Sequence, residues 1–160
     1  MKLIKILALG FVSFQAHANQ PNFSINWQHD INQIKASQTN KLVEIQAHRL
    51  TYKSELFNEE FEQEFLFNQQ GKLSNVLYYK SFKVTDENCV SQYKYFKDAA
   101  TKQFGQSETV AEGDIASCQS AANAQYRLTS LWQTNSEKVS LKLNTWKGVP
   151  YIGLSIEPSQ

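Results

Sequence analysis

Alternating polar and apolar residues fill long stretches of this chain and constrain its fold more than any other feature. In residues 59–67, Phe61, Phe65 and Phe67 alternate with glutamates, and residues 68–72 supply a turn. A period of two is typical of a strand with one buried face. This stretch and residues 73–80 therefore predict an antiparallel hairpin.

The expected register of this hairpin places Phe67 opposite Leu73. The phenylalanines then share one buried face, and the other face carries a set of polar and aromatic residues: Glu60 opposite Lys80, Glu62 opposite Tyr78, and Glu64 opposite Val76.

The C-terminal stretch predicts a second antiparallel unit. Residues 126–132 form one expected strand, and Val139, Leu141 and Leu143 alternate with polar residues in the next. After a turn at 147–148, the apolar positions of 152–156 face those three residues in reverse order. In the first half, residues 41–52 predict a strand whose alternation changes phase, which a bulge near His48–Arg49 would restore.

Two helices complete the expected elements. Trp27, Ile31 and Ile34 follow a helical spacing, with Ser24 as the candidate N-cap. A longer helix begins after residues 85–87 and ends at Gly105, with an apolar stripe along it: Cys89, Tyr93, Phe96, Ala100 and Phe104. A connector follows, with a short helix expected near Cys118.

The predicted class is therefore α+β, an antiparallel sheet with helices packed on one face. Both halves have the order helix then three strands, and Arg49-Leu50-Thr51 recurs in the second half as Arg127-Leu128-Thr129. Residues 22–84 and 85–158 are accordingly a possible tandem repeat within a single domain, 19–160.

The N-terminal segment, 1–18, is typical of a cleavable export signal. Lys2 and Lys5 are basic, an apolar segment follows, and Ala16-His17-Ala18 matches a small-x-small cleavage site. We expect the mature chain to begin near Asn19 and to reside in the periplasm, with secretion as the alternative. The apolar run is shorter than the roughly 20 residues that span a bilayer, so no membrane insertion is expected.

Cys89 and Cys118 are the chain's 2 cysteines. In an oxidising compartment they predict one disulfide, which would hold the start of the long helix to the connector. A redox or metal pair would call for a CxxC motif or a neighbouring histidine, and neither is present.

The charge balance does not favour nucleic acid as a partner. Without Lys2 and Lys5, 14 of the 16 basic residues remain against 15 acidic ones, a net charge of −1. Nucleic-acid binding calls instead for clustered Lys and Arg.

The sequence predicts no catalytic residues, no cofactor and no metal site. His29 and His48 belong to different elements and lack ligand spacing, and no HExxH or GxSxG motif occurs. Glu62 and Glu64 share one strand face, whereas glycoside hydrolysis needs carboxylates across a cleft. An enzyme of another type stays open, because a site can assemble in space.

The candidate binding surface is the face predicted to be uncovered: Glu60, Glu62, Glu64, Tyr78, Lys80 and Trp146, with Phe82 at the same parity. The glutamates form either an acidic edge for a basic partner or a solvated face neutralised by lysines. The aromatic residues indicate either a binding patch or a face covered by the N-terminal helix.

This element order resembles the beta-lactamase inhibitor protein and the outer-membrane assembly lipoproteins that share its repeat, and also periplasmic immunity proteins. The segment Lys102-Gln103-Phe104-Gly105 and the strand containing Trp132 are similar to theirs in position. The chain departs from the inhibitor in having one cysteine pair, and from the lipoproteins in lacking a lipid-attachment cysteine. No functional residue carries over.

The resemblance implies a non-catalytic module that binds another protein, as an inhibitor or an immunity protein does. The alternative is an envelope carrier of a small ligand or lipid, with an apolar cavity between sheet and helices.

Overall fold

The computed structural model describes residues 25–112, 116–123 and 127–159. The predicted export signal, residues 1–18, and the proposed Ser24 cap lie outside the described residues.

The first half of the chain contains one short helix and four strands, in the order α1 (Ile31–Ser37), β1 (Leu42–Gln46), β2 (Arg49–Leu56), β3 (Glu59–Phe67) and β4 (Leu73–Ser81). The second half contains two helices and four strands, in the order α2 (Cys89–Phe104), β5 (Glu108–Glu112), α3 (Cys118–Ala121), β6 (Arg127–Gln133), β7 (Glu137–Trp146) and β8 (Val149–Pro158).

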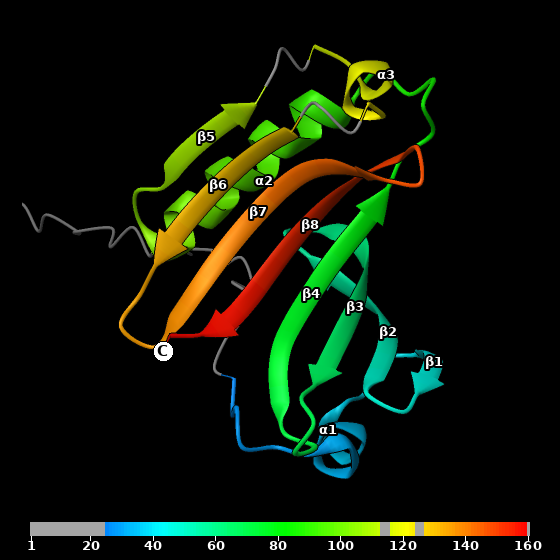
Figure 1. Cartoon of the computed structure of the whole chain (residues 1–160), viewed down its shortest axis with the longest axis vertical. Helices are drawn as coiled ribbons and strands as arrows, with labels where there is room; N and C mark the ends of the chain where they lie inside the picture. Colours follow the sequence, from blue (N-terminus) through cyan, green and yellow to red (C-terminus); the bar gives the residue numbers. More distant parts are fainter. Residues whose placement is uncertain (1–24, 113–115, 124–126, 160) are drawn as a thin grey trace, which may run out of the picture.

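All eight strands form one antiparallel sheet in the order β1-β2-β3-β4-β8-β7-β6-β5. Within each half, neighbouring strands follow chain order, and the last strands of the two halves, β4 and β8, pair at the centre (Figure 1). The arrangement confirms the predicted α+β class.

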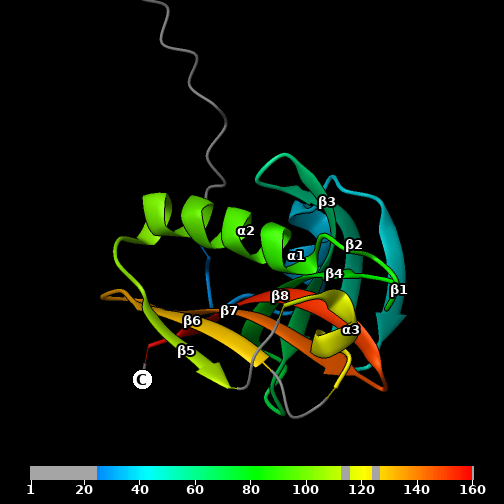
Figure 2. The same cartoon turned by 90° about the horizontal axis from the view of Figure 1, so that it is seen from above.

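The helices α1 and α2 lie on the same side of the sheet (Figure 2). We call the side that they cover the inner face, and the opposite side, turned toward the viewer in Figure 1, the outer face. No helix of the described residues is long and apolar enough to cross a membrane.

The inner face carries two clusters of buried side chains. The larger one joins α2 and α3 to β6, β7 and β8, and the smaller one joins α1 to β2, β3 and β4. Ile25, Trp27 and Tyr78 contact both clusters. The two halves therefore share a continuous interior.

The long helix follows its predicted stripe. Cys89, Tyr93, Phe96 and Ala100 are buried, and Gly105 ends the helix with a φ of 88°, a value that glycine adopts without strain. The helix begins later than residues 85–87 suggested, with Asn88 at the N-cap.

The predicted disulfide is present. Cys89 and Cys118 are bonded, with their Cα atoms 5.3 Å apart. The bond holds the start of α2 to α3.

The N-terminal helix is shorter than predicted. It begins at Ile31, and Asp30 caps it by accepting hydrogen bonds from the backbone N–H groups of Asn32 and Gln33. Trp27 lies before the helix and packs against the core. An aspartate N-cap with glutamine at the third helical position forms a capping box, which fixes the start of the helix at this point.

The expectation of one bulged strand over residues 41–52 was wrong. A tight turn at Ala47–His48 divides this stretch into β1 and β2, with Gln46 opposite Arg49. The turn, rather than a bulge at this point, changes the phase of the alternation. All five residues of β1 are exposed, because β1 is the edge of the sheet and no helix covers it.

The expected register of the β3–β4 hairpin holds only at its turn. Phe67 lies opposite Leu73, but an irregularity next to Phe67 shifts the remaining pairs by one residue. Phe65 therefore lies opposite Val76, and Glu62 lies opposite Tyr79 rather than Tyr78. Because side chains alternate between faces, this one-residue shift moves Tyr78 and Lys80 to the inner side.

The C-terminal meander matches its prediction. Val139, Leu141 and Leu143 lie opposite Ile156, Leu154 and Ile152. All six side chains are buried on the inner face, beneath α2.

Each half contains four strands rather than the predicted three, because β1 was read as part of β2 and β5 was missed in the connector. Even so, the hairpins β2–β3 and β6–β7 have the same register at the sequence offset of the Arg-Leu-Thr repeat. Leu50 lies opposite Phe65 in the first, and Leu128 lies opposite Leu143 in the second.

Candidate functional site

A groove of about 490 Å³ opens on the outer face of the sheet. Residues of β2, β3, β4, β7, β8 and the β7–β8 turn line it: Arg49, Glu64, Leu77, Tyr79, Ser81, Trp146, Lys147, Val149 and Tyr151. The groove therefore crosses the junction between the two halves of the chain.

The tip of the β7–β8 hairpin forms one rim. Lys147 and Gly148 both have positive φ values, 52° and 80°, which a two-residue turn between twisted strands favours. This turn holds Trp146 with 69 % of its surface exposed, opposite the half-exposed Val149. The Lys147 Nζ lies 5.8 Å from the centre of the Trp146 ring, within the range of a cation–π contact.

Gly153 lies next to two residues of the groove, Leu77 and Tyr151. A Cβ at this position would lie 3.3 Å from Tyr151 Cε2 and 3.4 Å from Leu77 Cδ1. Those two side chains close over the glycine from β8 and β4, so the absence of a side chain at Gly153 lets them approach each other.

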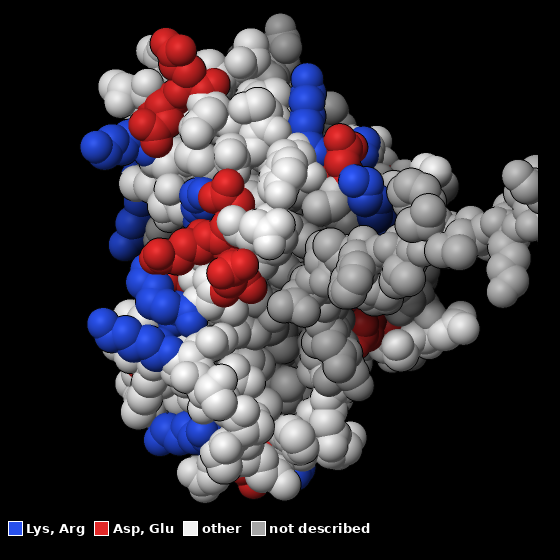
Figure 3. Space-filling model, turned by 180° about the vertical axis from the view of Figure 1, so that it is seen from behind, with Lys and Arg blue, Asp and Glu red and all other residues white. Residues whose placement is uncertain are grey.

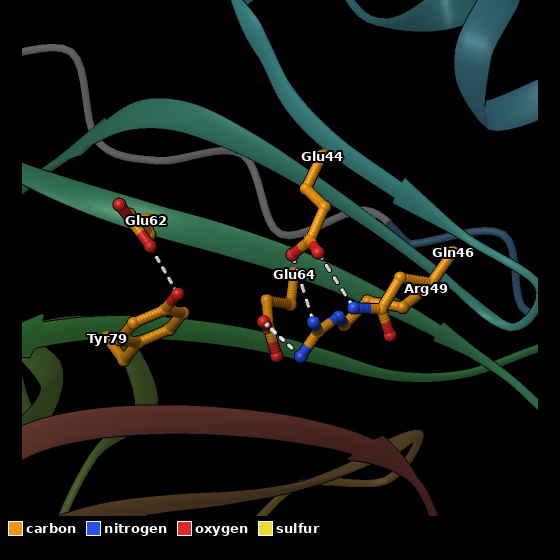
Figure 4. Close-up of polar contacts among 6 residues, drawn as sticks. All are labelled: Glu44, Gln46, Arg49, Glu62, Glu64 and Tyr79. Carbon is orange, nitrogen blue, oxygen red and sulfur yellow. Dashed lines mark hydrogen bonds and ion pairs between the residues drawn. The ribbon is translucent and has the colours of Figure 1, made fainter.

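A charged cluster occupies the opposite end of the groove (Figure 4). The Arg49 guanidinium forms ion pairs with Glu64 and Glu44, each at 3.0 Å. Glu64 is buried, and this burial raises the pKa of its carboxyl group while the charge of Arg49 acts in the opposite direction. The pair is thus an internal structural contact at the wall of the groove.

Tyr79 joins the groove to the neighbouring acidic residues. Its hydroxyl donates to the Glu62 carboxylate, and this hydrogen bond lowers the pKa of Glu62 (Figure 4). Burial and the same contact raise the pKa of Tyr79. Lys53 completes the set, with its ammonium 3.2 Å from Glu62 and 3.3 Å from Glu60.

The structure divides the predicted binding surface. The alternation of β3 and β7 places Glu60, Glu62, Glu64 and Trp146 on the outer face, and Trp146 is largely accessible there. Of the glutamates, Glu60 is exposed, Glu62 is half-buried and Glu64 is buried.

The other predicted members lie elsewhere. Tyr78 faces inward, where its hydroxyl accepts from Gln63 Nε2 at 2.7 Å, and burial raises its pKa to about 12. Lys80 lies on the same side and pairs with Glu59 at 2.6 Å. Phe82 is buried in the larger cluster. The shift in the β3–β4 register explains the wrong face of Tyr78 and Lys80.

Sequence reasoning missed most of the groove, including Leu77, Tyr79 and Tyr151. Two signals in the sequence could have found it. The adjacent Tyr78 and Tyr79 leave open which ring faces outward, and a glycine inside the apolar alternation of β8 often marks a close approach of neighbouring groups.

The groove holds few groups suited to proton transfer. Burial raises the pKa of Tyr151, and the pKa of Tyr79 is raised as well, so both phenols stay protonated near neutral pH. Across residues 25–112, 116–123 and 127–159, no group of three or more His, Cys, Asp or Glu side chains is arranged to hold a metal ion.

Comparisons with protein-family models, curated proteins and solved structures found no match to this chain.

Proposed function

We propose that this protein is a non-catalytic binding module that engages another protein through the outer face of its sheet, as an inhibitor or an immunity protein does. The observation that carries the proposal is Trp146. An indole exposed to 69 % on an open sheet face, at the rim of a groove, has the features of an interface anchor.

The surroundings of Trp146 support the same interpretation. Leu77, Val149 and Tyr151 extend its apolar surface into the groove. Contiguous exposed apolar patches bordered by polar residues mark sites of interaction with proteins, membranes or ligands. The rim is held by paired strands and a tight turn, so little ordering accompanies binding.

The chemistry of the groove favours binding over catalysis. Its one carboxylate, Glu64, is held by Arg49, and its two phenols have raised pKa values. A general acid or base works best with a pKa near the working pH.

A carrier of a small ligand has weaker support. The space between α2 and the sheet is filled by side chains that are nearly inaccessible, including Phe96, Leu141 and Leu154. A carrier would need an apolar cavity in this position.

We place the protein outside the cytoplasm, in the periplasm. The Cys89–Cys118 disulfide supports this location, since such bonds persist in oxidising compartments. The export signal over residues 1–18 stays a prediction, and mass spectrometry of the protein from its own source would find a chain that begins near Asn19.

The two halves, 22–84 and 85–158, are proposed to be a tandem repeat. The equal register of β2–β3 and β6–β7, at the sequence offset of the Arg-Leu-Thr repeat, supports this relationship. The mirrored strand order about the β4–β8 pair supports it too.

The test is capture of proteins from an envelope extract by wild-type protein and by Trp146→Ala. We expect at least one captured protein to be lost with Trp146→Ala, because truncating an interface anchor costs about 2 kcal/mol or more, roughly 30-fold in affinity. Val110→Ala is the control, since Val110 is an exposed apolar side chain on the β5 edge.

Thermal unfolding accompanies the capture. Trp146→Ala should change the free energy of unfolding by less than about 0.5 kcal/mol, as expected for an exposed side chain. Equal capture by wild type and Trp146→Ala would exclude the groove rim as the binding surface. A lipid recovered by solvent extraction of the purified protein would instead support the carrier.

A further inference from the structure

The glutamates of β3 are paired with cations of the first half. Glu59, Glu60, Glu62 and Glu64, the acidic group of β3, each form an ion pair with a cation of a neighbouring strand: Lys80, Lys53, Lys53 and Arg49. Lys53 is shared by Glu60 and Glu62, and Arg49 is shared by Glu64 and Glu44, so the cluster holds more carboxylates than cations. Pairing with cations therefore reduces the negative charge of this surface without cancelling it.

The second half of the chain carries lysines on the outer face that are not paired in this way. On the outer side of β7, Lys138 and Lys142 are exposed, and Lys147 is exposed in the adjoining turn. Among the described residues, none of these three lysines forms an ion pair. Glu157, opposite Lys138, accepts one hydrogen bond from Asn75 and one from Ser155 instead.

Two of these lysines border the groove. Lys147 lies in its lining, and Lys142 lies beside it, opposite Gly153, which contacts the lining residues Leu77 and Tyr151. Trp146 stands between them in the chain, on the same face of β7 as Lys142 and about 13 Å farther along the strand. The indole therefore has the Lys147 ammonium group against it and Lys142 farther along the same face.

On the inner side, acidic and basic side chains are mixed along one margin (Figure 3). The lysines along β7 are distinguished by their place on the outer face, where Lys142 and Lys147 lie on the same strand and turn as the exposed Trp146. A surface of this kind attracts and orients a negatively charged partner.

Resting on the proposed function, we infer that the groove receives an acidic segment of the partner protein, with an aromatic or aliphatic side chain against Trp146 and neighbouring carboxylates on Lys142 and Lys147. Charge complementarity selects this occupant. Arg49 is already paired with Glu44 and Glu64, while the ammonium groups of Lys142 and Lys147 have no such partner in the described part of the chain.

The test selects peptides of about twelve residues from a random display library on the wild-type protein, a length that spans a groove of this kind. Peptides that also bind Trp146→Ala are removed. We expect the remaining peptides to be enriched in Asp and Glu around one aromatic or aliphatic residue.

Charge-reversal variants then measure the contribution of the lysines. Lys142→Glu and Lys147→Glu should each weaken peptide binding about tenfold, and raising NaCl from about 50 mM to about 500 mM should weaken binding to the wild type. Lys94→Glu, an exposed lysine on α2, is the matched control and should bind like the wild type.

The outcomes separate the two proposals. Peptides that need Trp146 but are neutral or basic, or that tolerate both charge reversals, overturn the acidic segment and leave the binding surface intact. Failure to recover any peptide that depends on Trp146 counts against the binding surface itself. Equal binding of anionic phosphatidylglycerol vesicles that also needs Lys142 and Lys147 would assign the surface to membranes and overturn the inference.

Discussion

The hairpins β2–β3 and β6–β7 have one register but are filled by different side chains. In the first, Ser54 lies opposite Phe61, and at the equivalent place in the second, Trp132 lies opposite Val139. The large residue is on β3 in one hairpin and on β6 in the other, and both are buried. The same register thus accommodates a small and a large residue in one hairpin and a larger pair in the other.

The covering helices differ more strongly. The helix α1 has seven residues and buries only Ile34, whereas α2 has sixteen and buries four side chains. Moreover, α2 reaches into the first half, because the Phe96 ring lies 5.0 Å from that of Phe61. Trp132 anchors the other end of α2 by donating from Nε1 to the Gly105 carbonyl at 2.9 Å. The helix α2 of the second half therefore covers the inner face of both halves of the sheet.

Phe96→Ala tests this shared cover and should have the largest effect. The side chain is 1 % exposed and contacts both halves, so its truncation should lower the free energy of unfolding by about 3–5 kcal/mol. Ile34→Ala, confined to the α1 cluster, should cost less, about 2–3 kcal/mol.

Denaturant unfolding followed by circular dichroism and tryptophan fluorescence measures both variants. If α2 packs on both halves, circular dichroism and fluorescence should report a single unfolding transition in Phe96→Ala. Two separate transitions would show that the halves fold independently of α2.

Removal of the disulfide is expected to have the next largest effect. Replacing both Cys89 and Cys118 by alanine should lower stability by about 3–4 kcal/mol, because the bond closes a loop and restricts the unfolded chain. Binding through Trp146 should be unchanged, since the disulfide lies between α2 and α3 rather than at the groove. Calorimetry measures the stability. Loss of peptide binding by a folded double variant would contradict the prediction that the disulfide does not affect the groove.

The smallest expected effect compares Glu59 and Glu137, which occupy equivalent positions at the start of β3 and β7. Glu59 is paired with Lys80, whereas Glu137 is buried and has no ion pair among the described residues. This burial raises the pKa of the Glu137 carboxyl group, so its ionisation opposes folding. Stability should thus fall as pH rises from the ordinary glutamate value through the raised one.

Glu137→Gln should therefore stabilise the protein at neutral pH, by at most about 1 kcal/mol, and the gain should vanish in acid. Glu59→Gln should destabilise slightly, within the range of about 0–1 kcal/mol found for surface pairs. Unfolding curves at several pH values measure both. A stability gain of Glu137→Gln that is constant with pH would rule out ionisation as its cause.

Local patterns in the sequence were enough to predict an antiparallel sheet, the helix α2, the C-terminal meander and the disulfide. The alternation of apolar residues and a two-residue turn were enough to predict the partners on β8 of Val139, Leu141 and Leu143. The helical spacing of the apolar residues from Cys89 to Ala100, together with Gly105, was enough to predict α2. Such features depend on contacts close in sequence or on a single pair of cysteines.

The tertiary structure alone decided which aromatic residues form the groove. One irregular pair beside Phe67 exchanged the faces of Tyr78 and Tyr79, and the pairing of β4 with β8 brought Leu77 next to Gly153. It also decided which cations pair with the glutamates of β3, since Arg49 and Lys53 come from β2. A single-residue shift has little local cost but reverses every side chain after it, so only the packing of the whole sheet selects the register.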